Sequence, residues 1–162
     1  MGLVYIHPDF HVGKIGSQTH FASDFGVSKS DINLHIEYFD GVQTHIAFAA
    51  FDTDGTLFID IPVPGAPPGT FDEIIIETGL TIFPSPVSWN VFKLAIDIST
   101  FKYVAVFVNG QRVDLSGFDL VSKPDATRRH ILSIIENTTR VDGDPQLVFF
   151  DNYIFTEDET FT

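Results

Sequence analysis

The last hydrophobic stretch of the sequence, residues 147–156, contains a carboxylate, Asp151, among aromatic side chains. Burying an unpaired carboxylate is energetically costly, so this side chain must be exposed, hydrogen-bonded or bound to a cation. Asp151 therefore bears on whether the protein contains a metal site, a ligand site or neither. An internal hydrogen bond is the preferred interpretation.

A second polar group falls on a predicted hairpin. Residues 31–38 and 44–51 alternate between apolar and polar side chains, and the residues at 40–41 predict a turn between them. Pairing Ile36 with Ile46 would match the apolar faces of the two strands. This register requires a bulged or odd-length turn.

In this register Glu37 lies directly across from His45, with His35 on the diagonal. The preferred interpretation of these side chains is a solvent-exposed face with a Glu–His pair. Two alternatives stay open, because imidazoles and a carboxylate can also line a polar groove or bind a divalent metal. In an enzyme, Glu37 with His35 or His45 would supply the acid and the base.

Trp89 is the single tryptophan of the chain. An aromatic ring can stack on the apolar face of a sugar ring, which makes Trp89 a candidate for ligand binding. A lone tryptophan between apolar residues of a strand more often belongs to the core, and this is the preferred interpretation.

The elements that must position these residues are short β-strands. Period-2 alternation dominates the sequence, and no segment has convincing helical periodicity. An Asn-Gly pair at 109–110 predicts a tight hairpin, and the last strand, apolar on both faces, is predicted to be central in its sheet. The predicted strands are residues 31–38, 44–51, 56–61, 71–78, 80–83, 87–98, 103–108, 111–115 and 147–156, with 129–137 either a strand or a helical turn. They predict an all-β fold, an antiparallel sandwich or barrel.

No linker divides the chain, so we expect a single domain over residues 1–162, which could be a fragment of a longer chain. The formal net charge is −13 and there is no cysteine. This charge repels phosphate backbones and anionic membranes, so we expect neither nucleic acid nor a membrane as a partner. It favours cations such as Ca²⁺ or neutral ligands such as sugars. The N-terminal residues do not resemble a signal peptide.

Three segments resemble the concanavalin A-like jelly-roll superfamily, which includes lectins, laminin G-like domains and glycan-cleaving enzymes. They are a Trp-x-x-x-Lys-Leu-x-Ile-Asp strand at 89–97, the strand and turn at 103–110, and the Phe-Asp-Asn-Tyr-Ile segment at 150–154. The resemblance spans about residues 20–160 and implies an antiparallel β-sandwich of jelly-roll type. The Glu-x-Asp-x-x-Glu motif of the glycoside hydrolases in this superfamily is absent from the sequence, which argues against that activity.

The resemblance implies a carbohydrate-binding module, non-catalytic, of a polysaccharide-handling protein. Such sandwiches place a glycan on a concave face or in edge loops. The residues that we expect to bind the ligand are His35, Glu37, His45 and Trp89. The alternatives are a glycan hydrolase or lyase, and a structural jelly roll that forms homo-oligomers.

The same resemblance implies a metal and a location. In glycan-binding sandwiches an aspartate late in the chain often holds a structural Ca²⁺ together with an acid from the first strands. The corresponding metal candidates are Asp151 and Asp24. The superfamily also favours an extracellular location, although the sequence itself carries no signal that decides the compartment.

Overall fold

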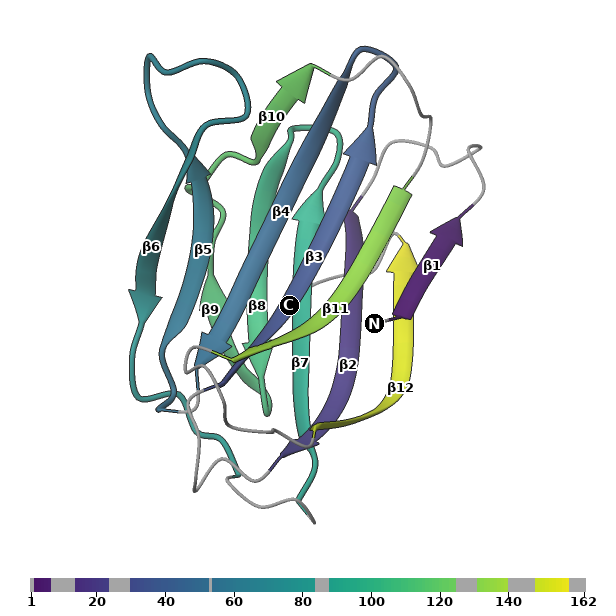
Figure 1. Ribbon diagram of the computed structural model, residues 1–162, viewed down its shortest axis with the longest axis vertical. Helices are drawn as coiled ribbons and strands as arrows, with labels where there is room; N and C mark the ends of the chain where they lie inside the picture. The colour runs from purple at the N-terminus through teal and green to yellow at the C-terminus, as the bar shows by residue number, and fades with distance from the viewer. Residues whose placement is uncertain are drawn as a thin grey trace.

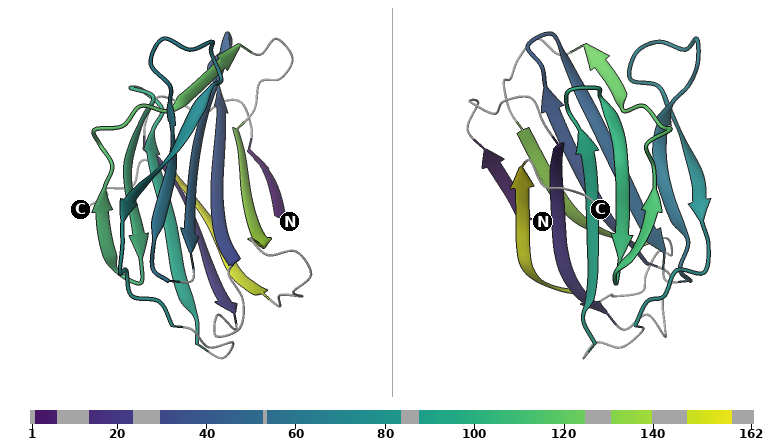
Figure 2. Two further views of the ribbon diagram at one scale, coloured as in Figure 1. Left: turned by 60° about the vertical axis from the view of Figure 1, so that its left-hand side comes forward. Right: turned by 180° about the vertical axis from the view of Figure 1, so that it is seen from behind.

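Two antiparallel β-sheets stack face to face in the computed structural model of the protein (Figures 1 and 2). The structure describes residues 2–6, 14–23, 30–52, 54–83, 88–124, 131–139 and 148–157. Over these ranges every regular element is a strand, and no helix that could cross a membrane is found. The predicted all-β antiparallel sandwich is confirmed.

The larger sheet has seven strands in the order β1-β11-β3-β4-β5-β6, with β10 paired to β4. Its strands are β1 (Gly2–Ile6), β3 (Ser30–Phe39), β4 (Gln43–Asp52), β5 (Leu57–Pro62), β6 (Phe71–Glu77), β10 (Val121–Pro124) and β11 (Ile131–Thr139). β1 and β6 form its two edges, which lie on opposite sides of the molecule in Figure 1.

The smaller sheet has five strands in the order β12-β2-β7-β8-β9. Its strands are β2 (Lys14–Ser23), β7 (Asn90–Asp97), β8 (Lys102–Val108), β9 (Gln111–Asp114) and β12 (Val148–Glu157). The last strand lies at an edge of this sheet, so the central position predicted for it is wrong. Its register against β2 shifts between Asp151 and Ile154. The Asp-Asn pair therefore falls at an irregularity of an edge strand, where such interruptions are common.

The hydrophobic core lies between the two sheets, because successive side chains of a strand point to opposite faces and one set from each sheet points inward. Its largest fully buried side chains are Tyr103, Phe51, Phe92, Ile32, Leu34, Ile36, Leu57, Ile59, Leu94 and Ile96. The alternate residues of β3, β4 and β5 therefore lie on the outer face of the larger sheet.

Most of the predicted strands are present. Residues 109–110 form the predicted hairpin turn, with φ of 48° at Asn109 and 83° at Gly110, and the ambiguous segment 129–137 contributes to strand β11. Strands β1, β2 and β10 were not among the strands predicted from alternation. β1 and β10 have five and four residues, too few for a period-2 pattern to stand out.

The predicted strand at 80–83 is wrong. These residues run beside other elements without joining a sheet. The Leu80 N–H donates to the Gly55 carbonyl at 3.0 Å, and the Phe83 N–H donates to the Asn90 side chain at 2.8 Å. Side chains and a turn carbonyl thus satisfy backbone groups that a neighbouring strand would otherwise pair.

Candidate ligand-binding groove

A two-residue turn sets the register of β3 against β4. The Asp40 N–H donates to the Gln43 carbonyl at 3.1 Å, and Gly41 adopts a φ of 108°. The Asp40 Oδ1 accepts hydrogen bonds from the amides of Val42 and Gln43 at 2.7 and 2.8 Å. The turn is therefore short and of even length, as in tight hairpins, and not bulged or odd as predicted.

This turn moves the register by one residue from the prediction. Glu37 pairs with Ile46, and His45 pairs with Tyr38. A shift of one residue sends every side chain to the other face of the strand. His45 consequently points into the core, while His35 and Glu37 lie on the outer face. The predicted juxtaposition of Glu37 and His45 is wrong.

His45 is enclosed by the core and only 4% exposed. Its Nε2 lies 2.9 Å from the Asp40 Oδ2 and its Nδ1 lies 2.8 Å from the Ser122 Oγ. The ring stacks on Phe101, from the turn before β8, with centroids 3.7 Å apart and an interplanar angle of 4°. Both ring nitrogens are engaged inside the protein, so His45 has no free nitrogen to offer a ligand.

The larger sheet splits beside β4. β5 pairs with β4 over residues 49–51, whereas β10 is the neighbour of β4 further along, with Val121 opposite Ile46. In Figure 1, β10 lies between the upper parts of β4 and β5. The outer face of the sheet is therefore opened where β5 and β6 diverge from β4.

A tyrosine from the opposite sheet bridges β4 and β5 where they separate. Tyr103 on β8 is 1% exposed, and its hydroxyl accepts a hydrogen bond from the Phe48 N–H at 3.0 Å and donates to the Asp60 carbonyl at 2.8 Å. Burial raises the pKa of Tyr103 well above its usual range. The neutral hydroxyl thus replaces a direct backbone hydrogen bond between β4 and β5.

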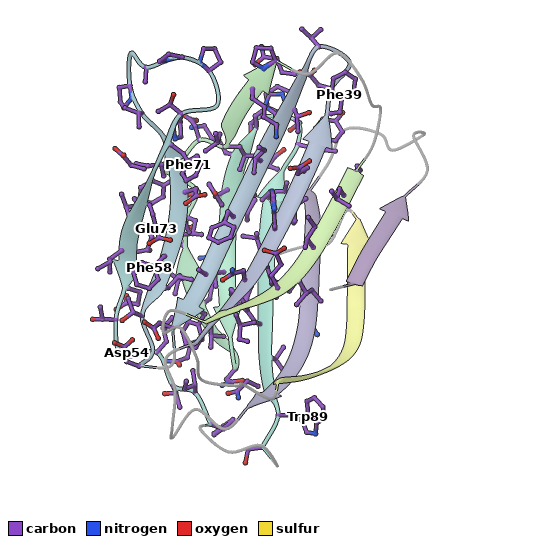
Figure 3. The ribbon with its side chains drawn as sticks, in the orientation of Figure 1. Phe39, Asp54, Phe58, Phe71, Glu73 and Trp89 are labelled. Carbon is purple, nitrogen blue, oxygen red and sulfur yellow. The ribbon has the colours of Figure 1, made fainter. Side chains whose placement is uncertain are left out.

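A groove with a volume of about 440 Å³ lies over the split. This volume is within the range of about 300–1,000 Å³ that is usual for small-molecule sites. The residues that line it are His35, Glu37, Ile46, Phe48, Asp60, Gly69, Phe71, Glu73, Val121 and Lys123. Figure 3 labels Phe71 and Glu73 on β6, along one side of this face.

Two carboxylates face each other across β5 and β6. Asp60 pairs directly with Glu73, and side chains opposite each other in an antiparallel pair lie close together. Asp60 is only 9% exposed. Burial, and then the negative charge of Glu73, raises the pKa of Asp60 to about 6. This pair makes one wall of the groove strongly acidic at neutral pH.

The opposite wall is less acidic because it carries a cation. Lys123 on β10 places its Nζ 3.9 Å from the Glu37 Oε1. His35 Nε2 lies 3.5 Å from the same oxygen and is buried without a hydrogen bond. Burial, with a smaller contribution from Lys123, lowers the pKa of His35 against the opposing effect of Glu37 and Glu136. His35 is therefore neutral near pH 7.

Aromatic and aliphatic side chains complete the groove. Phe48 contributes from β4, and Phe71 from β6 exposes 53% of its surface. His35 and Glu37 were predicted from the sequence as site residues, whereas Asp60, Glu73 and Phe71 were not. Phe71, Glu73 and Ile75 lie on one face of a predicted strand, but nothing in the sequence places β6 across a groove from β3 and β10.

Trp89 does not line the groove. It is 47% exposed and precedes β7 of the smaller sheet, and Figure 3 shows it at the end of the sandwich away from Phe71. The preferred interpretation of Trp89 as a core residue is wrong. Its predicted role in ligand binding remains a prediction, at a place separate from His35 and Glu37.

The predicted metal ligands lie largely outside the described structure. Asp24 is outside the described residues, and of Asp151 only the backbone pairing with His20 is described. Over the ranges given above, no group of three or more His, Cys, Asp or Glu side chains is arranged to hold a metal ion. The Ca²⁺ site at Asp151 and Asp24 stays a prediction.

The fold is similar to a known structure, that of sheep galectin-11 in complex with glycerol. The TM-score is 0.53, the sequences are 11% identical, and the alignment covers 96% of each chain. The chain has a concanavalin A-like lectin fold. The resemblance inferred from the strand motifs is thereby confirmed at the level of the fold. Comparison of the sequence with protein-family models and with curated proteins gives no match.

Proposed function

We propose that this β-sandwich is a non-catalytic carbohydrate-binding module of a polysaccharide-handling protein, and that the saccharide lies in the groove over the β4–β5 split. The observation that carries the proposal is the combination of aromatic and carboxylate side chains around one groove of about 440 Å³. A sugar ring has apolar C–H faces and a rim of hydroxyl groups, so its recognition requires both kinds of side chain.

Each wall would have its own role. Phe71 exposes 53% of its surface, so its ring is available to stack on a sugar face. Glu37 and Glu73 offer carboxylate oxygens, which are strong acceptors for hydroxyl donors. The likeness to a galectin that binds glycerol, a polyol, supports the same class of ligand.

The geometry excludes one of the two acid–base pairs that the sequence suggested. A mechanism with Glu37 and His45 would need both side chains on one face, whereas His45 lies in the core on the other face of the hairpin. Glu37 with His35, whose Nε2 lies 3.5 Å from the Glu37 Oε1, stays the alternative proposal of a hydrolase or lyase, and product analysis after incubation with the oligosaccharides distinguishes it from binding alone.

The test is isothermal titration of the protein with neutral oligosaccharides, compared between wild type and Phe71→Ala. We expect the variant to lose up to about tenfold in affinity, since an aromatic contact contributes about 0.5–1.5 kcal/mol and about 1.4 kcal/mol corresponds to tenfold. Phe83→Ala is the matched control, because Phe83 is also exposed, by 45%, and does not line the groove.

Two further outcomes would redirect the proposal. Loss of binding in Trp89→Ala with no change in Phe71→Ala would move the saccharide to the end of the sandwich near β7. No binding by the wild-type protein of any saccharide, charged or neutral, would overturn the proposal in favour of a structural role.

Thermal unfolding in Ca²⁺ and in a chelator, with Asp151→Ala as the variant, tests the predicted metal site separately.

A further inference from the structure

The two walls of the groove differ in charge. On the β3–β10 side, Lys123 lies within ion-pair distance of Glu37 and offsets its charge. On the β5–β6 side, Asp60 and Glu73 stand opposite each other, and among the described residues that line the groove Lys123 is the one lysine or arginine. His35 adds no positive charge near neutral pH because its pKa is lowered. Negative charge is therefore concentrated at Asp60 and Glu73.

This juxtaposition is unfavourable in the free protein. Like charges directly opposite each other in a sheet repel, and Asp60 is 9% exposed, so water screens the repulsion only in part. The raised pKa of Asp60, about 6, is a consequence of its burial and of this neighbour. A cation between the two carboxylates would remove the repulsion and gain an attraction to both.

The neighbouring side chains restrict which cation fits. Phe48 and Phe71 line the same groove, and an aromatic ring attracts both a cation and the C–H face of a sugar. A primary ammonium group is compact and has three donors, enough to reach two carboxylates at once. The net charge of −13 further favours the approach of a cationic ligand and disfavours sulfated or uronic glycans.

We infer that the groove is selective for saccharides that carry a free, protonated primary amine, with the ammonium group held between Asp60 and Glu73 and a sugar ring against Phe71. The inference rests on the proposed carbohydrate-binding function and specifies its ligand class. It assigns to Asp60 and Glu73 the discrimination between an amine and its neutral N-acetyl counterpart.

The test uses three tetrasaccharides of the same β-1,4 linkage: one of glucosamine, one of N-acetylglucosamine and one of glucose. Titration calorimetry slightly below neutral pH, where the sugar amine is largely protonated, should show the glucosamine tetramer binding at least about tenfold more tightly than either neutral tetramer. The advantage should shrink as the salt concentration rises, because the attraction is electrostatic.

Variants of Asp60 and Glu73 test whether these two carboxylates provide the selectivity for the amine. Glu73→Gln and Asp60→Asn should each reduce the ratio of the affinity for the glucosamine tetramer to that for the glucose tetramer by at least about threefold, and a loss common to both ligands leaves this ratio unchanged. Asp72→Asn is the matched control, since it removes one negative charge from the same strand at a residue outside the groove lining. Glu73 is exposed, so Glu73→Gln is expected to fold even if Asp60→Asn does not.

Proton release gives an independent readout. An ammonium group beside Asp60 should lower the pKa of this carboxyl, so near pH 5, where the sugar amine is already protonated and Asp60 largely keeps its proton, binding of the glucosamine tetramer should release protons to the buffer. The other charged or titratable groups facing Asp60 in the groove are Glu73 from β6, His35 and Glu37 from β3, and Lys123 from β10. Titrations in buffers of different ionisation enthalpy measure the release, which Asp60→Asn should abolish.

The two proposals fail in different ways. If the neutral tetramers bind as tightly as the glucosamine tetramer, or if Asp72→Asn removes as much of the preference as Glu73→Gln, the amine selectivity is overturned and the carbohydrate-binding function stands. If none of the three tetramers and no other saccharide binds, both are overturned.

Discussion

The two faces of the β3–β4 hairpin each carry a histidine, and the two histidines have opposite surroundings. His45, on the inner face, is 4% exposed, has both ring nitrogens within hydrogen-bond distance of Asp40 and Ser122, and stacks on Phe101. His35, on the outer face, lines the groove, and its buried Nε2 has no hydrogen bond. His45 thus contacts the turn through Asp40, β10 through Ser122 and the opposite sheet through Phe101, whereas His35 borders an open groove.

The strand register therefore decides which of the two histidines is buried in the core and which lines the groove. The sequence gives both histidines alternating neighbours, so neither pattern distinguishes them. The two-residue turn at 41–42 fixes the pairing, and the pairing decides that His45 is structural while His35 faces the groove. Four substitutions would sharpen or break this contrast.

The largest effect is expected from the two histidines themselves. His45→Ala should lower the free energy of unfolding by about 2–4 kcal/mol, because it leaves a cavity beside Phe101 and buried polar groups without partners. His35→Ala should change it by less than about 1 kcal/mol. Urea unfolding of both variants measures the difference, and equal losses would contradict the structural role given to His45.

A smaller effect is expected at the split that forms the groove. Tyr103→Phe keeps the aromatic ring but leaves the Phe48 N–H and the Asp60 carbonyl without the bridging hydroxyl. The cost should be about 1–3 kcal/mol. Hydrogen exchange of the Phe48 amide should accelerate more than that of Ala50, which lies on the same side of β4 and pairs directly with β5. Equal acceleration at both amides would argue against a local role of the hydroxyl.

The smallest effect should depend on pH and arise in the groove. The folded-state pKa of Asp60, about 6, lies above its ordinary value of 3.8. Folding therefore favours the protonated carboxyl, and the stability that this proton contributes is present below about pH 4 and lost as the pH rises through 6.

Asparagine resembles the protonated form at all pH values. Asp60→Asn should stabilise the protein by about 1–2 kcal/mol above pH 7 and have almost no effect near pH 4. Thermal or urea unfolding as a function of pH measures this difference, with Asp72→Asn as the control. A gain that does not vary with pH would mean that the ionisation of Asp60 is not its source.

The sequence predicted most of the strands because their alternation is local. Residues 31–38 and 44–51 each carry the period of a half-buried strand, and Asn109-Gly110 carries the backbone preference of its turn. The predictions failed where the outcome depends on distant partners. Residues 80–83 have strand-like composition, yet their backbone groups bond to a turn carbonyl and to side chains such as that of Asn90.

Some residues of the candidate site could also be predicted from local patterns, and others could not. His35 and Glu37 could be predicted because an amphipathic strand displays its polar residues on one face. Asp60 and Glu73 could not be predicted as a pair, because they meet only when β5 and β6 align across the intervening proline-rich loop. The role of Tyr103 was also hidden, since it reaches β4 and β5 from the opposite sheet.

The sequence by itself determined the all-β class, the hairpin turns and the acidic character of the chain, because these follow from side-chain periodicity, backbone preference and a count of charges. Tertiary structure alone decided which face His45 occupies, where β10 separates β4 from β5, and that Asp60 faces Glu73. The separation of β4 from β5 depends on β10, which is far from both in the chain, and the Asp60–Glu73 pair depends on how β5 and β6 align across the loop between them. The face of His45 depends on the pairing that the turn at 41–42 allows, because a shift of one residue in the hairpin exchanges core for surface.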